Sequence, residues 1–133
     1  MGKAAAKSGD KIKGNDTHTV VLSSNGASEP RSFSFSGAIA SGLSSNVRIN
    51  SQFAAVVGSG ADNVPAHNAG SDSFAAPPSN KGSVYSGSAT VKINSKAAAR
   101  HGDQATTCSE PPTPGNGQVE VANATAATVR FGD

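Results

Sequence analysis

The chain has 133 residues, enough for one domain, and alanine supplies much of its 35% hydrophobic content. Val, Ile, Leu and Phe together number only 22 residues, a low share that would suggest disorder in a highly charged chain. Charged residues make up only 15%, however, and the formal net charge is +2, so the second mark of a disordered chain is missing. We therefore expect a lean fold that needs a metal or a partner for stability.

Several classes of protein are excluded by what the sequence lacks. The single cysteine rules out an internal disulfide, and no stretch approaches the roughly 18 apolar residues of a membrane helix. We find no secretory signal peptide and so expect synthesis in the cytoplasm. The lysines are scattered and stacking aromatics are few, so we do not expect nucleic acid as a partner.

Short strands are the elements that the sequence supports, because Gly, Ser, Asn and Pro recur every few residues. In chain order, the predicted strands are Thr17–Ser23, Arg31–Ser36, Asn46–Ile49, Ala54–Gly58, Ser83–Ser86, Ala89–Ile93, Gln118–Ala122 and Ala127–Phe131. We predict loops at Ala76–Asn80 and at the proline-rich segment Glu110–Gly115. The pattern predicts an all-β fold.

An internal repeat underlies these elements. Three nine-residue segments align without gaps, each with an Ala-Ala pair followed three positions later by Gly: Gly2–Asp10, Ser51–Ser59 and Ser95–Asp103. Abundant Ala and Gly make a chance match the alternative, above all for the first segment. The spacing is too long for a solenoid and favours three similar hairpins around one axis. Alanine suits a crowded centre and Gly suits a tight turn, which makes Asp10 and Asp103 turn residues rather than a catalytic pair.

The histidines and the cysteine follow the register of the repeats. His18 and His67 each come nine residues after a repeat glycine, His101 precedes Gly102, and Cys108 follows it by six residues. Three imidazoles and one thiolate make a closed tetrahedral set that suits one structural Zn²⁺, with iron as the alternative. The simpler interpretation is three surface histidines and a buried thiol. Because a full shell leaves no place for a catalytic water and no other group is a candidate general base, we predict that the protein is not an enzyme.

The third repeat and the residues before it resemble a known family. Lys96–Asp103, preceded by Val91-Lys92-Ile93-Asn94, is similar to the proline-alanine-alanine-arginine (PAAR) repeat, as are Gly2–Asp10 and Gly42–Asn50. The proline positions of the motif hold other residues here, and its arginine is kept only as Arg100. The resemblance spans roughly residues 1–108.

The resemblance implies a small cone with pseudo-threefold repeats and a metal at its tip, held by His18, His67, His101 and Cys108. PAAR proteins cap the trimeric β-helical spike, of the VgrG or phage type, in contractile injection machines such as type VI secretion systems, extracellular particles and phage tails. One chain per trimer, effector cargo and brief contact with the target membrane during piercing follow from that role, as does delivery outside the producing cell or into the target. We divide the chain into a cone at residues 1–108 and a proline-rich connection with a short C-terminal hairpin at 109–133.

Two other functions compete with a spike tip. A metal-binding or carrier protein without a spike partner would keep the ligand set but not the docking base. A small metallohydrolase would need an exchangeable water on the metal.

Overall fold

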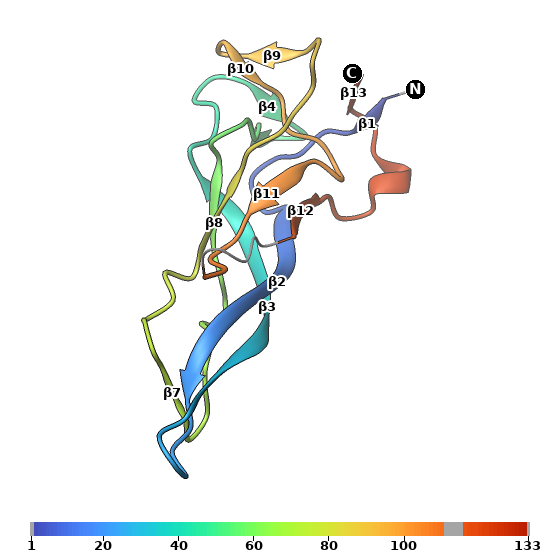
Figure 1. Ribbon diagram of the computed structural model, residues 1–133. Helices are drawn as coiled ribbons and strands as arrows, with labels where there is room; N and C mark the ends of the chain where they lie inside the picture. The colour runs from blue at the N-terminus through green and yellow to red at the C-terminus, as the bar shows by residue number, and fades with distance from the viewer. Residues whose placement is uncertain (1, 111–115, 133) are drawn as a thin grey trace.

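A computed structural model describes residues 2–110 and 116–132 of the chain. The molecule is elongated, with short hairpins and both chain ends at a wide end and a long two-stranded ribbon that runs to a narrow end (Figure 1). The elements are β1 (Lys3–Ala4), β2 (Lys11–Val21), β3 (Ser28–Ser41), β4 (Arg48–Ile49), β5 (Gln52–Phe53), β6 (Gly60–Asp62), β7 (Ser73–Phe74), β8 (Lys81–Val84), β9 (Lys92–Ile93), β10 (Lys96–Ala97), β11 (Gln104–Thr106), β12 (Gly117–Glu120), the 3-10 turn η1 (Ala124–Ala126) and β13 (Arg130–Phe131). The predicted all-β fold is confirmed. In the part of the chain that the structure describes, no helix is long and apolar enough to span a membrane.

Six strands close into a small antiparallel barrel in the middle of the molecule. They follow in the order β12, β11, β8, β6, β3 and β2, and β12 also pairs with β2. Side chains alternate across each strand, which sends one set into the barrel. The largest inward-facing residues, each at most 1% exposed, are Ile12, Phe35, Ile39, Val84 and Val119. Closure leaves the barrel without a free edge, which protects a core with few bulky residues.

The ribbon of β2 and β3 continues beyond the barrel toward the narrow end. Their antiparallel register runs unbroken along the whole of β2, and β7 pairs with its last two residues. Burial alternates along β2, so that Ile12, Asp16, His18 and Val20 are all buried on one face. Two polar side chains therefore occupy positions at which an apolar strand would place core residues.

The three sequence repeats bond to one another in a closed cycle. The N–H of Ala6 donates to the carbonyl of Ala99, Ala99 donates to Ala55, and Ala55 donates to Ala6, each over 3.0 Å. All three side chains are fully buried, with 0% exposure, so the centre of the cycle has room only for small residues. This cycle confirms the predicted pseudo-threefold arrangement.

Each repeat then turns at its glycine. The three glycines adopt the left-handed φ values of 93°, 100° and 87°, in the order Gly9, Gly58 and Gly102. The side-chain oxygen of the next residue accepts the N–H of the residue three positions before it, as Asp10 and Asp103 do for Lys7 and Arg100. Both aspartates are thus turn residues, as the sequence predicted.

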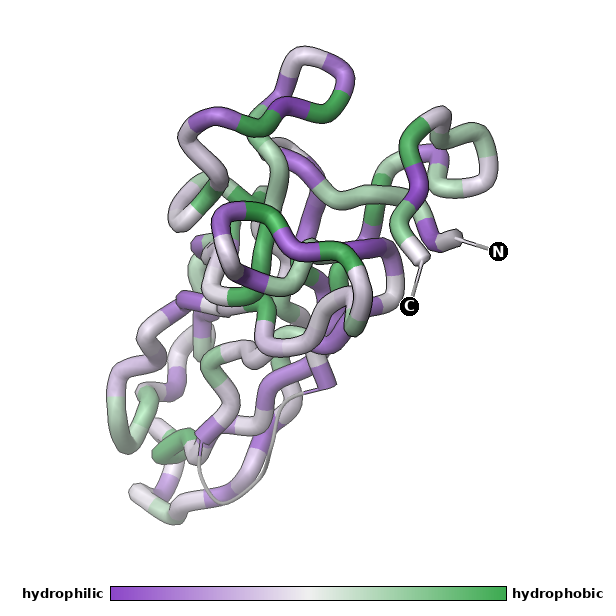
Figure 2. The backbone as a smooth tube through the Cα atoms, turned by 90° about the horizontal axis from the view of Figure 1, so that it is seen from above, coloured by the Kyte–Doolittle hydropathy of each residue, from purple (hydrophilic) through white to green (hydrophobic). Residues whose placement is uncertain are grey.

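Three equivalent hairpins surround the wide end: β4 with β5, β9 with β10, and β13 with β1. In Figure 2, which looks onto the wide end, they form three loops around the centre of the molecule, the third beside the chain ends. In each hairpin a valine carbonyl accepts the N–H of a repeat alanine, in the pairs Val47 with Ala54, Val91 with Ala98, and Val129 with Ala5. The third hairpin therefore joins strands from opposite ends of the chain, and β12 of the same C-terminal segment completes the barrel.

The strand predictions differ from the structure mainly at the closed cycle of the three repeats. Ala54–Gly58 is not a strand, because these residues form the central cycle and its turn instead. The prediction missed β1, β5, β6, β7, β10 and β11, whose short sequences are rich in Gly, Ala, Ser, Lys and Gln and give little strand signal. The other predicted strands overlap observed ones, and Ala76–Asn80 is a loop, as predicted. Residues 111–115 of the second predicted loop lie outside the described residues.

Candidate metal centre

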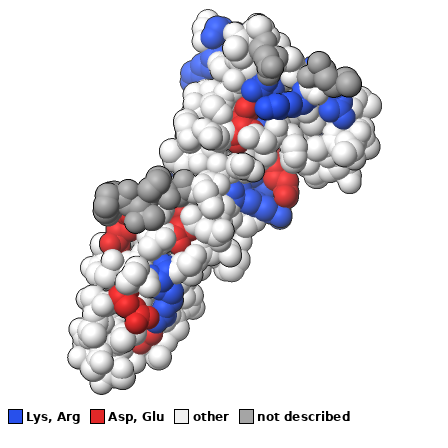
Figure 3. All heavy atoms as spheres, turned by 45° about the vertical axis from the view of Figure 1, so that its right-hand side comes forward, with Lys and Arg blue, Asp and Glu red and all other residues white. Residues whose placement is uncertain are grey.

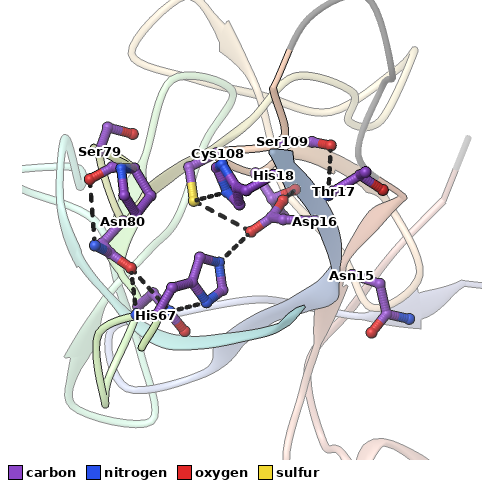
Figure 4. Close-up of polar contacts among 12 residues, drawn as sticks. Asn15, Asp16, Thr17, His18, His67, Ser79, Asn80, Cys108 and Ser109 are labelled. Carbon is purple, nitrogen blue, oxygen red and sulfur yellow. Dashed lines mark hydrogen bonds and ion pairs between the residues drawn. The ribbon is translucent and has the colours of Figure 1, made fainter. Parts of the chain in front are cut away.

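Four side chains from distant parts of the chain meet where the ribbon leaves the barrel (Figure 4). Asp16 and His18 come from β2, His67 from the segment between β6 and β7, and Cys108 from the segment after β11. One potential ligand atom of each lies within 4.8 Å of all the others, and the described residues hold no second group of this kind. Asp16 Oδ2 is 2.7 Å from His67 Nε2 and 3.2 Å from Cys108 Sγ, and that sulfur is 3.6 Å from His18 Nε2.

The segment that carries the cysteine is held against β2 by hydrogen bonds at one residue before the cysteine and two residues after it. The hydroxyl of Thr107 donates to Asp16 Oδ1. Ser109 Oγ accepts the N–H of Thr17 over 2.9 Å, and the N–H of Glu110 donates to the carbonyl of Thr17 over 2.9 Å. These bonds on both sides of the cysteine hold its sulfur toward the inner face of β2.

Two asparagines fix the orientation of His67. Asn80 Oδ1 accepts the N–H of His67 over 2.9 Å and a proton of the Asn63 amide over 3.1 Å. Asn63 Oδ1 accepts the N–H of Ser36, which leaves its Nδ2 to donate to His67 Nδ1 over 3.1 Å. The imidazole therefore carries its proton on Nε2 and donates it to Asp16.

Aromatic rings close the site on the side of the narrow end. Phe33 and Phe74 pack against the imidazole of His18 with ring centroids 5.9 and 5.8 Å away, and Phe33 lies 5.2 Å from His67. The side chains of His67 and Asp16 are only 2% and 0% exposed. Charges and metal–ligand bonds in such a place are poorly screened by water.

Burial sets the protonation of the cluster in the absence of a metal. It lowers the pKa of His18, and the nearby His67 acts in the same direction. Burial, followed by the hydrogen bond to Asp16, raises the pKa of the Cys108 thiol to about 11. Near neutral pH the cluster thus has a neutral His18 and a protonated Cys108, with Asp16 accepting the hydrogens around it.

The four donors fit a tetrahedral metal ion. A carboxylate oxygen, two imidazole nitrogens and a thiolate sulfur are all zinc ligands, and bond lengths of about 2.0–2.3 Å place ligand atoms about 3.3–3.7 Å apart. The separations of 3.2 and 3.6 Å around Cys108 are close to that range, whereas the hydrogen bond between Asp16 and His67 is shorter. A bound metal would take the place of the thiol proton of Cys108, so binding would release a proton, and His67 would bind through Nε2 as a neutral imidazole with its proton on Nδ1.

The structure brings together three of the four predicted ligands but not His101. That residue occupies the position of Ser8 and Val57 in the repeat, which belongs to the turn of the ring at the wide end. Its Nδ1 accepts the N–H of Val121 over 3.1 Å, and its side chain is exposed. Asp16, which the sequence analysis did not select, stands beside the other three instead. The signal for it was its place two residues before His18, because positions i and i+2 of a strand share a face.

The raised pKa of Cys108 gives the metal-free protein a characteristic pH dependence. The folded state keeps the thiol proton up to about pH 11, whereas the unfolded chain releases it near its ordinary value of 9.0. The folded state thus binds more protons between these values, and the free energy of unfolding should fall as the pH rises through this window. Urea unfolding of metal-free protein at pH 8, 9.5 and 11 measures the decline. Cys108→Ser is the control, and an equal decline in that variant would assign the effect to other groups.

Comparison with known proteins supplies one match. Residues 75–132 match the family model described as the PAAR motif, a range that holds the third repeat, Cys108, β12 and β13. Searches of curated proteins and of solved structures returned no match. The matched range covers somewhat less than half of the chain, and together with the closed cycle of three repeats it supports a PAAR-repeat protein.

Proposed function

We propose that the chain is a structural spike tip that caps the trimeric β-helical spike of a contractile injection machine. The observation that carries this proposal is the cycle of three repeats with its three equivalent hairpins. A single chain that presents three similar edges around one axis matches a partner with three identical subunits, at a ratio of one chain per trimer. The outward edges of the hairpins are suited to strand addition onto a β-helix.

We further propose that a metal ion, zinc or alternatively iron, locks the narrow half. Asp16, His18, His67 and Cys108 would hold it, and no position of a tetrahedral shell would remain for a catalytic water. Such an ion would tie the ribbon to the segments around His67 and Cys108, where the described core holds few large apolar side chains. A structural role therefore suits this site better than hydrolysis does.

The shape of the molecule is consistent with piercing. The ribbon tapers away from the barrel, and its backbone hydrogen bonds run from strand to strand along the whole length of β2 (Figure 1). A load along the axis passes from the narrow end through the ribbon into the closed barrel and the ring. In this role the chain catalyses no reaction, and its function depends on its stiffness.

Binding to a spike separates the tip from a free-standing metal carrier. The purified chain is mixed with a trimeric β-helical spike protein of the VgrG type, and the complex is sized by light scattering after gel filtration. We expect one chain per trimer, and no complex with a matched trimer from which the last turn of the β-helix is deleted. Failure to bind the intact trimer, or equal binding to the shortened one, would favour the carrier.

A further inference from the structure

The three hairpins at the wide end share a basic position. The residue that pairs with the third residue of each repeat is a cation in every hairpin: Arg48 opposite Phe53, Lys92 opposite Ala97, and Arg130 opposite Ala4. The second residue of the repeat is basic in two of the three hairpins, as Lys3 and Lys96, and is Gln52 in the other. Nearly half of the 11 cations of the chain thus lie on these short hairpins. We call these five side chains the basic ring.

The basic ring differs from most of the other cations in having no ion pair with a described residue. None of its members forms an ion pair with any described residue, and the described residues of the hairpins contain no Asp or Glu. Arg130 instead donates to the main-chain carbonyls of Gly2, Ala124 and Thr125. By contrast, five of the six remaining cations pair with carboxylates, namely Lys7, Lys13, Arg31, Lys81 and Arg100.

The ring is also accessible. All five side chains belong to exposed residues, while Ile49 and Ile93 on the same strands are buried in the apolar cluster beneath the hairpins. On the face drawn in Figure 3, the outermost part of the wide end shows Lys and Arg atoms, and Asp and Glu atoms lie further toward the narrow end. The unpaired positive charge therefore faces outward at the end where a partner would dock.

We infer that the basic ring recognises carboxylates on the docking partner, one similar group on each of three subunits. This inference rests on the proposed function. Positive charges held in one ring repel one another, and facing carboxylates remove that repulsion and speed the encounter. A cation at the same position of all three hairpins matches three identical acidic sites, whereas neither a nucleic acid nor a lipid surface has threefold symmetry. The partner is thus a trimeric protein with an acidic blunt end.

Charge removal on the ring tests the inference. Lys3→Gln/Arg48→Gln/Lys92→Gln neutralises one cation on each hairpin and leaves the carbonyl contacts of Arg130 intact. Lys11→Gln/Lys13→Gln/Lys81→Gln removes the same charge from exposed residues of the barrel. The dissociation constant of each protein for the same VgrG-type spike trimer is measured by calorimetry at 50 and 300 mM NaCl, together with sedimentation onto vesicles containing phosphatidylglycerol. Thermal melting checks that both triple variants are folded.

We expect the ring variant to bind the trimer about tenfold or more weakly than wild type at 50 mM NaCl, and to lose most of the salt dependence. The barrel variant should bind within about twofold of wild type, since exposed charges away from an interface contribute little. Equal affinities of the two variants, or wild-type binding that is insensitive to salt, would overturn the inference and leave the spike-tip proposal standing. Ring-dependent binding to vesicles with no ring effect on the trimer would overturn it in favour of a lipid surface. A wild-type chain that does not bind the trimer at all refutes the proposed function itself.

Discussion

One equivalent of Zn²⁺ should raise the melting temperature of the metal-free protein by on the order of 10 °C or more, because structural zinc contributes its binding free energy to folding. Asp16→Asn should weaken zinc binding by about 100-fold or more, since it replaces a buried anionic ligand by a neutral amide. His101→Gln should leave the affinity within about twofold of wild type, because its Nδ1 is bonded to Val121 in the ring at the wide end. Scanning calorimetry and competition with a chromogenic chelator measure the two quantities.

The pair of variants distinguishes the observed ligand set from the one that the repeat register predicts. Cys108 belongs to both ligand sets, so Cys108→Ser should abolish tight zinc binding and is the positive control. Loss of zinc binding in His101→Gln with retention in Asp16→Asn would show that the chain rearranges around the metal and would contradict the assigned site. The affinity of wild type should also fall as the pH is lowered, because zinc must displace the thiol proton of Cys108.

Arg100→Ala should lower the free energy of unfolding by about 3–5 kcal/mol, because it leaves a buried carboxylate without its partner. The guanidinium donates to both oxygens of Asp103, with a shortest distance of 2.8 Å, and the two side chains are only 7% and 4% exposed. Arg100 also donates to the carbonyl of Gly132 over 3.1 Å and so links the third repeat to the C-terminal residues of the chain. Urea unfolding monitored by circular dichroism measures the loss.

The second repeat supplies a matched rescue of this variant. Val56 and Ser59 stand at the positions of Arg100 and Asp103, and the N–H of Val56 donates to Ser59 Oγ over 3.0 Å without any charge. The double variant Arg100→Val/Asp103→Ser copies this pair into the third repeat and should recover more than half of the lost stability. Lys81→Ala, at an exposed ion pair, should change the stability by less than about 0.5 kcal/mol. A double variant as unstable as Arg100→Ala would show that the ion pair is not the cause.

The parts of the architecture that could be predicted from the sequence are those built by the three repeats. The alignment of three Ala-Ala-x-x-Gly segments predicted the ring, because a crowded centre accepts only alanine and each turn needs a left-handed residue. The third hairpin was missed because its two strands are 125 or more residues apart in sequence, as the pairing of Lys3 with Phe131 shows. In this hairpin Phe131 takes the place of Ile49 and Ile93. Its strand β13 lies at the end of the chain, whereas the equivalent strands β4 and β9 come directly before their repeats in sequence.

The metal cluster shows a different limit of the sequence. His18, His67 and Cys108 could be selected from residue type and spacing, but the same spacing also selected His101. The repeat register describes the ring, whereas the cluster lies on the ribbon beyond the barrel, where the repeats no longer apply. Asp16 lies two residues before His18 and so shares its strand face, and the structure shows that this face of β2 is buried. The partners of His67, Asn63 and Asn80, come from loops whose approach no local pattern predicts.

Native mass spectrometry of the complex with the spike trimer, sprayed from neutral ammonium acetate, tests the spike-tip account most directly. The account predicts a single species with one copy of this chain, three spike subunits and one bound divalent metal ion. Three copies of the chain per trimer, or a stable one-to-three complex in which the chain carries no metal, would contradict it.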